Sequence, residues 1–385
     1  AEDGIRDRSP SRGLGDVYKR QICDNFNMSI NGSTVLVGVI GNPVKHSLSP
    51  AILNAAFREA EMNWVYTAFE TPEEKLADAI EGIRALGVAG LSVTMPHKAK
   101  VCQLLDEISD SARMLEAVNC VVNDAGKLKG HNTDGDGFLD AVKHDSGLNM
   151  VDKKILIIGS GGSARSIIYS LAKAGVGEIA VINRTKKKAL DALELAGSVA
   201  RHVDKDKISE VAAEADLVVN ATPIGMSDAG NTANFPIEPN LLSKGQHAVD
   251  LIYHPMSTPW MEALKNRKVE VHGGLSMLIF QAAKAFKLWT GHEAPVDAMR
   301  KAALYEIFFG RYFTNEPVLK KLMGKSVSLT NEGWEILNKR WIYFFFGLAI
   351  LNELVWRTQS EEFWVNFKVW GICLLYTSDA ADEGL

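Results

Sequence analysis

Cysteine is scarce in this sequence, and neither sign of charge dominates. The four cysteines among 385 residues lie far apart, with no C-x-x-C pair and no histidine-rich spacing, so neither a disulfide framework nor a zinc site is indicated. The formal net charge of −5 provides no field that would gather nucleic acid. The charged N-terminus also lacks the apolar segment of a signal peptide. We therefore expect reduced thiols, a cytoplasmic protein, and neither a metal nor a nucleic-acid partner.

An apolar run long enough to span a bilayer is missing too. The aromatic-rich segment 340–357 contains an uninterrupted apolar stretch from Trp341 to Leu351, after which Asn352 and Glu353 interrupt it. A spanning helix needs about 20 apolar residues. We expect 304–372 to form an appended helical, aromatic-rich tail, and any membrane contact to be made through this tail alone.

Both ends of the chain lack hydrophobic periodicity. Residues 1–33 mix charge, glycine and serine, which is typical of a disordered leader, and we expect a disordered end at 373–385. Both segments resemble translated library-adapter sequence, so we interpret them as non-native.

Between residues 34 and 303, short apolar segments alternate with amphipathic ones, which predicts an α/β fold with parallel sheets. One helix is expected over 73–86, where Leu76, Ile80 and Ile83 share a face. A break near 135–150 separates two groups of strands. The expected strands are 34–41, 64–70, 90–96, 153–159, 178–184, 215–221 and 246–253.

A glycine-rich turn lies between an expected strand and helix in "ILIIGSGGSARSIIYSLAKAG", 155–175. Gly159 suits a tight turn, Gly161 lets a pyrophosphate approach the backbone, and the small Ala164 lets helix and strand pack closely. Phosphates would lie at the helix N-terminus, where N–H groups are unpaired. Such turns also close ordinary βα units, but here the strand and helix context favours a dinucleotide site.

The next expected strand ends at Asn183 and Arg184, where an NAD site usually has an acidic residue for the ribose hydroxyl. A guanidinium suits a 2′-phosphate, and Thr185 with Lys187 or Lys188 would add donors or charge. A solvated basic helix start is the alternative. Together with the glycine turn, the pattern favours NADP.

Lys98 follows a β-branched apolar run, and "GHNTDGDGF" places Asp134 in a polar turn at the seam between the two halves. Ligands of two-domain α/β proteins tend to bind at such a seam. A Lys–Asp pair there would transfer a proton at an oxygen while a nicotinamide exchanges hydride with the attached carbon. An ordinary surface salt bridge is the alternative.

Two hydroxyls, Ser47 and Ser49, precede Pro50 and an expected helix in "NPVKHSLSPAIL". Hydroxyls and free helix N–H groups at such a turn can receive a carboxylate. A plain helix N-cap explains Ser49 equally well.

Over 34–303 the sequence resembles the shikimate dehydrogenase family. The motifs that carry the resemblance are GNPVKHSLSP, GLSVTMPHK, EAVNCVV, GHNTDG, GSGGSA, NRT, NATPIGM, DLIYHP and GGLSMLIFQAA. The resemblance implies NADP-dependent reduction of 3-dehydroshikimate to shikimate in chorismate and aromatic amino-acid biosynthesis. It also implies a substrate-binding domain over 34–134, a Rossmann-like NADP-binding domain over 135–275, and helices at 276–303 that pack back on the first domain.

The resemblance also implies roles for individual residues. Lys98 and Asp134 become the catalytic pair. Ser47, Ser49 and Tyr253 become contacts to the substrate carboxylate. Thr94, Asn119 and Gln281 become contacts to substrate hydroxyls. The expected cofactor contacts are Gly159, Ser160, Gly161, Gly162, Ser163, Ala164, Asn183, Arg184, Thr185, Lys188, Thr222, Gly274 and Met277.

Ser92 departs from the family pattern, since many members have Asn there. A shorter side chain would change how ring hydroxyls are bound, which leaves a quinate/shikimate dehydrogenase of dual specificity open. Arg184 without an acidic neighbour argues against an enzyme that prefers NAD. The resemblance implies shikimate or 3-dehydroshikimate as the small-molecule partner, and a homodimer is a further hypothesis.

Residues 304–372 resemble a fragment of the bacterial intracellular septation protein A family, whose members are membrane proteins. This leaves a second interpretation from another class, a membrane or septation-related structural protein acting through its tail. The complete motifs of the first part favour the enzyme.

Overall fold

The computed structural model describes residues 30–226, 235–308, 329–360 and 363. Most of the expected leader and the whole of the expected end, 373–385, lie outside these residues. The chain divides into two compact units, Ala1–Leu304 and Tyr305–Leu385. The expected tail boundary at residue 304 falls inside one helix, α11, Val296–Phe308.

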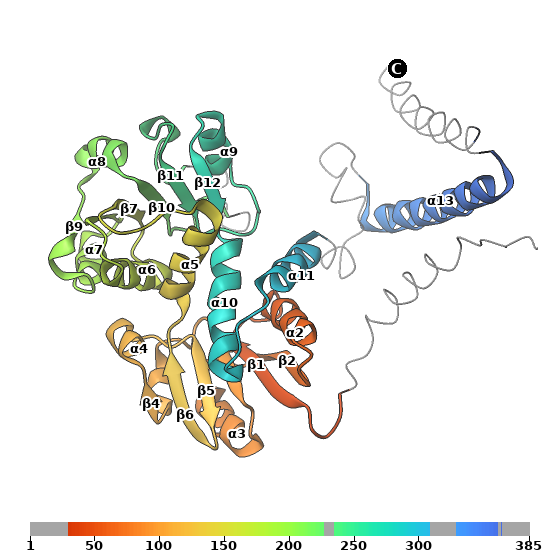
Figure 1. Ribbon diagram of the computed structural model, residues 1–385, viewed down its shortest axis with the longest axis horizontal. Coiled ribbons are helices and arrows are strands. Elements are labelled where there is room, and N and C mark those ends of the chain that lie inside the picture. The colour runs from red at the N-terminus through yellow and green to blue at the C-terminus, as the bar shows by residue number, and fades with distance from the viewer. Residues whose placement is uncertain (1–29, 227–234, 309–328, 361–362, 364–385) are drawn as a thin grey trace, which may run out of the picture. The chain divides into compact units, whose positions relative to one another are not determined.

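Two six-stranded sheets form the frame of the larger unit (Figure 1). The first sheet has the order β2 (Trp64–Glu70), β1 (Val35–Gly41), β3 (Gly90–Val93), β5 (Cys120–Asp124), β6 (Lys127–His131), β4 (Glu107–Ile108). The second has the order β12 (Glu270–Gly273), β11 (His247–Asp250), β10 (Leu217–Asn220), β7 (Lys154–Ile158), β8 (Glu178–Ile182), β9 (Ala200–His202).

The first sheet is mixed, which corrects the expectation of parallel sheets throughout. β1 pairs in parallel with β2 and β3, whereas β5 is antiparallel to both β3 and β6. β5 and β6 form a hairpin around Ala125 and Gly126, which both have positive φ, 50° and 93°. A two-residue turn of this kind joins strands without a helix, so strand–helix alternation could not reveal the pair.

The second sheet is parallel throughout, as predicted for a Rossmann-like domain. The chain adds β8 and β9 on one side of β7 and then returns to add β10, β11 and β12 on the other. Open α/β sheets bind ligands at the carboxyl ends of their strands where the order reverses. In this sheet that point lies between β7 and β10.

All seven expected strands form, but several are shorter than predicted. β3 ends at Val93 rather than at residue 96, because the chain turns through 95–99 and Pro96 has no N–H for a ladder. The expected helix at 73–86 begins as a 3₁₀ turn, Glu73–Lys75, and continues as α3, Leu76–Leu86. Leu76, Ile80 and Ile83 are its buried residues, which confirms the predicted face.

Helices cover both sheets and bury their apolar faces against them. The first sheet is associated with α2 (Ser49–Glu59), α3 and α4 (Asp110–Leu115). One face of the second sheet packs against α5 (Asp134–Ser146), α6 (Gly162–Lys173) and α7 (Lys186–Leu193), and the other against α8 (Ile208–Glu214) and α9 (Pro259–Asn266). Each face has its own core of buried aliphatic side chains.

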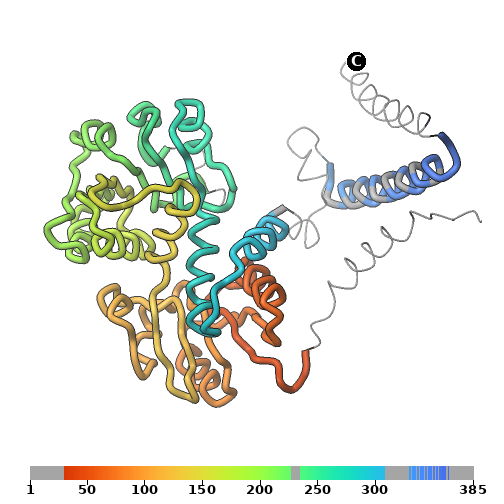
Figure 2. The backbone as a smooth tube through the Cα atoms, in the orientation of Figure 1, coloured from red at the N-terminus to blue at the C-terminus, as the bar shows by residue number. Residues whose placement is uncertain are grey.

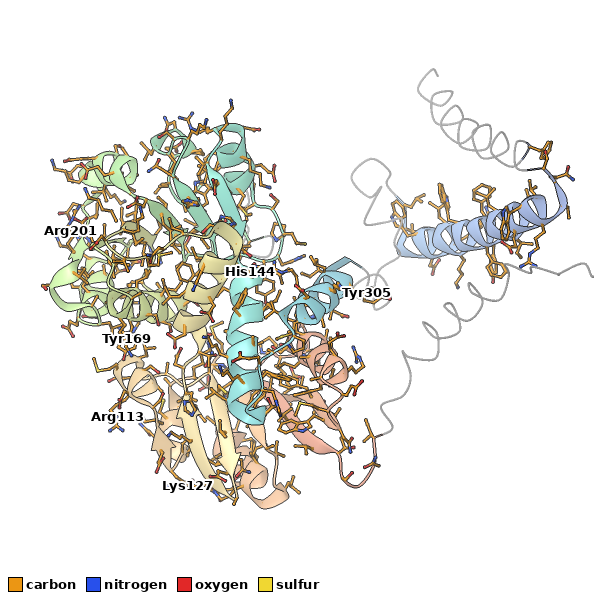
Figure 3. The ribbon with its side chains drawn as sticks, in the orientation of Figure 1. Arg113, Lys127, His144, Tyr169, Arg201 and Tyr305 are labelled. Carbon is orange, nitrogen blue, oxygen red and sulfur yellow. The ribbon has the colours of Figure 1, made fainter. Side chains whose placement is uncertain are left out.

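Helix α10 (Leu275–Thr290) lies beside α5 and extends to the first sheet (Figure 2). A Cβ on Gly137 of α5 would lie 2.6 Å from the backbone nitrogen of Gln281, so glycine permits this close approach. His144 at the end of α5, labelled in Figure 3, packs against the ring of Phe280. At the far end of α10, Trp289 Nε1 donates to the backbone oxygen of Val121 in β5. The helix therefore connects the two sheets.

The smaller unit contains α13, Asn331–Thr358, which begins where the Thr330 hydroxyl accepts from the Gly333 N–H. Among its described side chains several large aromatic ones are exposed, including Tyr343 and Phe346. The expectation of a helical, aromatic-rich tail is confirmed over this range. In the ranges that the structure describes, we find no helix with the length and apolar character to cross a membrane.

Candidate active site

Lys98 and Asp134 form an ion pair in the larger unit. Lys98 Nζ lies 2.7 Å from Asp134 Oδ2, and the two side chains are 31% and 11% exposed. Lys98 comes from the turn that follows β3. Asp134, expected in a turn, is the first residue of α5, so its carboxylate lies near the positive end of the helix dipole. The structure therefore brings these two residues together across 36 positions of sequence.

Asn119 fixes the other oxygen of the Asp134 carboxylate. Its Nδ2 donates to Asp134 Oδ1 at 2.7 Å and to Thr133 Oγ1 at 3.0 Å, while its Oδ1 accepts from the Thr133 N–H at 2.8 Å. The Asn132 amide oxygen accepts from the Asp134 N–H. Thr133 also donates to the backbone oxygen of Gln281, which links this network to α10. Because both of its oxygens have partners, the carboxylate is held in one orientation.

A cavity of about 350 Å³ opens beside this network. Every residue expected to contact substrate lines it, and so do three of the expected cofactor residues. The first group is Ser47, Ser49, Thr94, Lys98, Asn119, Asp134, Tyr253 and Gln281; the second is Ser163, Gly274 and Met277. The cavity is thus shared by the first sheet, the start of α6, the segment after β11, and α10.

The serine-containing turn leads directly into α2. Ser49 is its first helical residue and is 8% exposed, and Leu48 is the N-cap. The N-cap alternative for Ser49 is therefore wrong. Instead the Ser47 hydroxyl accepts from the Ser49 N–H at 3.2 Å, which satisfies one of the unpaired N–H groups at the start of α2. Both hydroxyl-bearing residues border the cavity at the positive end of a helix.

The glycine turn before α6 offers open space at a helix N-terminus. Gly159 has φ +108°, and a Cβ there would lie 2.9 Å from the backbone oxygen of Ala221. A Cβ on Gly161 or Gly162 would meet nothing within 4 Å. Ala164 is fully buried, whereas Ser163 is exposed. The arrangement fits a diphosphate placed against the first N–H groups of α6.

The turn after β8 exposes the guanidinium of Arg184 to solvent. Arg184, Thr185 and Lys188 are exposed, and Asn183 Nδ2 donates to the backbone oxygen of Thr185 at 3.0 Å. The amide of Asn183 therefore shapes the turn. The donor set fits a phosphate on the ribose, since guanidinium and hydroxyl groups both donate to phosphate oxygens.

A buried carboxylate connects two segments that reach the cofactor side of the cleft. Asp250, at the end of β11, accepts from Thr258 Oγ1 at 2.7 Å and from Asn220 Nδ2 at 3.0 Å, and burial raises its pKa. Asn220 Oδ1 in turn accepts from the hydroxyl of Thr222. Asp250 also accepts from the Ile252 N–H, so this network positions Thr222 after β10 and the start of the segment after β11 that leads to Tyr253.

The sequence analysis did not identify several residues that line the cavity. They include His46, Leu251 and Leu278, and also Ser92, which was considered only as a departure from the family pattern. Leu278 lies between Gly274 and Gln281 on one face of α10, so helical periodicity would have predicted it. Asn132 and Thr133 belong to the GHNTDG motif of the sequence analysis. Their role in holding Asp134 and Asn119 is visible only from their contacts in the structure.

Models of known families match most of the larger unit. Residues 39–121 match the shikimate dehydrogenase substrate binding domain, 141–226 match shikimate / quinate 5-dehydrogenase, and 274–304 match the shikimate 5′-dehydrogenase C-terminal domain. Residues 294–378, which include parts of both units, match the model of intracellular septation protein A.

Individual relatives agree with these models. The shikimate dehydrogenase (NADP⁺) of Methanopyrus kandleri is 42% identical over 291 residues, which cover 73% of this chain and 98% of the relative. The crystal structure of shikimate 5-dehydrogenase from Thermus thermophilus in complex with NADP(H) and shikimate is similar at 36% identity and a TM-score of 0.64, covering 70% of this chain and 98% of that one. Quinate dehydrogenase from Corynebacterium glutamicum in complex with NAD matches at 32% identity and a TM-score of 0.64, covering 70% and 99%. Because its match to relatives is this extensive, the chain belongs to the shikimate dehydrogenase family.

Proposed function

We propose that this chain catalyses the reversible, NADP-dependent reduction of 3-dehydroshikimate to shikimate, a step of chorismate and aromatic amino-acid biosynthesis. The observation that carries the proposal is the Lys98–Asp134 ion pair at a cavity that also reaches Ser163 at the start of α6. A substrate oxygen beside the Lys98 ammonium would therefore lie near the nicotinamide end of a dinucleotide whose diphosphate is bound at the N-terminus of α6.

The two ends of the substrate would meet different groups. Ser47, Ser49 and Tyr253 would donate to its carboxylate, since each carries a hydroxyl and lines the cavity. Thr94, Asn119 and Gln281 would bind the ring hydroxyls. Asn119 is already fixed by Thr133 and Asp134, so the substrate would meet a preorganised amide.

Lys98 would transfer the proton. Bound NADPH supplies the hydride, which goes to the carbonyl carbon of 3-dehydroshikimate. The Lys98 ammonium donates a proton to the carbonyl oxygen, which becomes the hydroxyl of shikimate. The resulting amine regains a proton from solvent, because the side chain is partly exposed. Asp134 keeps the ammonium in position through the ion pair. In the reverse direction the amine removes the hydroxyl proton.

We assign the preference for NADP over NAD to the turn after β8. Arg184, Thr185 and Lys188 would bind the 2′-phosphate, and Gly161 would allow the diphosphate to approach α6. Thr222, Gly274 and Met277 would complete the cofactor site.

A steady-state assay of shikimate and quinate, each with NADP and with NAD, tests the proposal. We expect the highest kcat/KM for shikimate with NADP. A higher value for quinate with NAD would contradict both the substrate and the cofactor assignment. The proposal also includes a cytoplasmic location and a homodimer, which cell fractionation and light scattering would test.

A further inference from the structure

Two histidines and a glutamate lie together at the edge of the second sheet, away from the cleft network. His247 of β11 is paired with Glu270 of β12, and His272 follows two residues later. Side chains alternate between the faces of a sheet, and paired residues share a face. Val271, between Glu270 and His272, packs into the core on the opposite face. The three side chains therefore project from one face of two neighbouring strands.

Their ligand atoms are close to one another. One nitrogen from each imidazole and one carboxylate oxygen all lie within 4.8 Å of one another. His247 Nδ1 is 3.3 Å from Glu270 Oε2, and the two rings are nearly parallel with centres 6.2 Å apart. A ring centre lies about 3.2 Å from an ion bound through a ring nitrogen, so one ion can reach both rings from a position between them, and a small approach of the rings would give a tetrahedral angle.

The imidazoles carry polar atoms without partners. Within the described part of the chain, His247 Nδ1 and His272 Nε2 are buried and make no hydrogen bond, although His247 Nδ1 lies 3.3 Å from Glu270 Oε2. Buried polar atoms normally have a partner, and one that lacks it needs an explanation. A cation shared by the two rings and the carboxylate would provide the missing interaction.

We propose that His247, Glu270 and His272 bind a divalent transition-metal ion, for which Zn²⁺ is the probe. Imidazole nitrogens with one carboxylate are a common donor set for this ion. Two atoms bound to one ion at about 2.1 Å lie at most about 4.2 Å apart, so any pair close to the 4.8 Å limit has to close by about 0.6 Å. The Glu270 side chain is 62% exposed, so its carboxylate is free to adjust to the position of the ion.

The ion has a route to the site and a structural consequence once bound. His272 also lines a second cavity of about 570 Å³, which shares Tyr253 and Gly274 with the cleft and gives access. β12 is the edge strand and pairs only with β11 in its sheet. The chain continues from β11 to Tyr253 and from β12 to Gly274. An ion that joins the two strands would therefore stabilise both segments that follow them and line the cleft. The site does not depend on the proposed reaction.

Calorimetric titration of the full chain with ZnCl₂, after removal of metal by a chelator, tests the site. We expect one ion per chain and a rise in Tm, both lost in His247→Gln/His272→Gln. The single variant Glu270→Gln keeps both rings, is expected to weaken binding at least tenfold, and provides a result if the double variant fails to fold. His292→Gln, an exposed histidine outside the sheet, is the matched control and should bind as the original chain does.

X-ray absorption at the zinc edge separates this site from adventitious binding. We expect two imidazole ligands and one oxygen ligand from protein. Absence of one-to-one binding in the original chain, equal binding by Glu270→Gln, or a sulfur-containing coordination shell would overturn the proposal.

Discussion

The two sides of the cleft are constructed by different means. On the substrate side, buried or half-buried side chains bind one another, as Lys98, Asp134 and Asn119 do within 2.7 Å. On the cofactor side, the structure offers exposed backbone at Gly161 and an exposed guanidinium at Arg184. The first arrangement fixes the position of a proton, whereas the second leaves room for a large charged ligand. We therefore expect changes on the substrate side to alter the rate of reaction and changes on the cofactor side to alter ligand preference.

The largest effect is expected from Lys98→Ala. If Lys98 moves the proton, the variant should keep its fold and NADP affinity while kcat falls by about 10²–10⁴-fold. Steady-state kinetics and fluorescence titration with NADPH measure the two quantities separately.

Lys100→Ala is the matched control, because Lys100 is two residues away and forms an exposed ion pair with Glu73. Exposed pairs contribute little, so its kcat should hardly change. Asp134→Asn should also be strongly impaired, and the double variant Lys98→Ala/Asp134→Asn should lose far less than the product of the single losses. A folded Lys98→Ala enzyme with near-normal kcat would show that Lys98 and Asp134 form only an ordinary salt bridge.

On the cofactor side, Arg184→Asp should shift preference from NADP towards NAD by roughly tenfold or more. The new carboxylate would repel a 2′-phosphate and accept from a 2′-hydroxyl. The measured quantity is the ratio of kcat/KM for the two cofactors.

Lys173→Glu carries the same change of charge at the C-terminal end of α6, about 17 Å along the helix axis from Gly162 of the glycine turn. It should leave the cofactor ratio nearly unchanged. An unchanged ratio in Arg184→Asp would remove Arg184 from the site.

The same contrast explains what the sequence could predict. The glycine turn, the basic strand end and the parallel second sheet follow from local patterns, because each depends on residues that are neighbours in sequence. The hairpin of β5 and β6 was missed, because its register depends on pairing with β3 rather than on a local period.

Within the cleft, the resemblance supplied positions for the substrate contacts, and physical reasoning from spacing supplied little. The link from Asn119 through Thr133 to Gln281 joins residues up to 148 positions apart. Nothing in a single sequence fixes such a contact. The Ser49 N-cap alternative failed for a local reason, since the helix begins one residue earlier than a Ser49 cap requires.

A smaller effect is expected where α5 packs against α10. Gly137→Ala should reduce the free energy of unfolding by about 1–3 kcal/mol, because the new Cβ would overlap the Gln281 backbone and force the helices apart. It should also raise KM for shikimate, since Gln281 lines the cavity. Denaturant unfolding and steady-state kinetics provide the measurements.

Gly82→Ala in α3 is the matched control, because a Cβ there meets nothing within 4 Å. Alanine is the better helix former, so this variant should gain about 0.5–1 kcal/mol. Equal effects of the two substitutions would show that the close approach of α5 and α10 is not required.

The smallest effect on catalysis is expected from removing the tail. A chain that ends at Phe308 keeps all of α11 and every residue assigned to the cleft, so its kcat/KM for shikimate with NADP should stay within about twofold of the full chain. Its soluble yield should rise, because the deletion removes the exposed aromatic side chains of α13, and large exposed apolar patches promote association. Parallel expression and assay of the two chains measure both quantities. Among the residues that the structure describes, the three hydrophobic cores that pack against the two sheets include no residue beyond 304, and this is the physical reason to expect independence. Loss of folding or activity in the shortened chain would mean that the segment after Phe308 stabilises the enzyme.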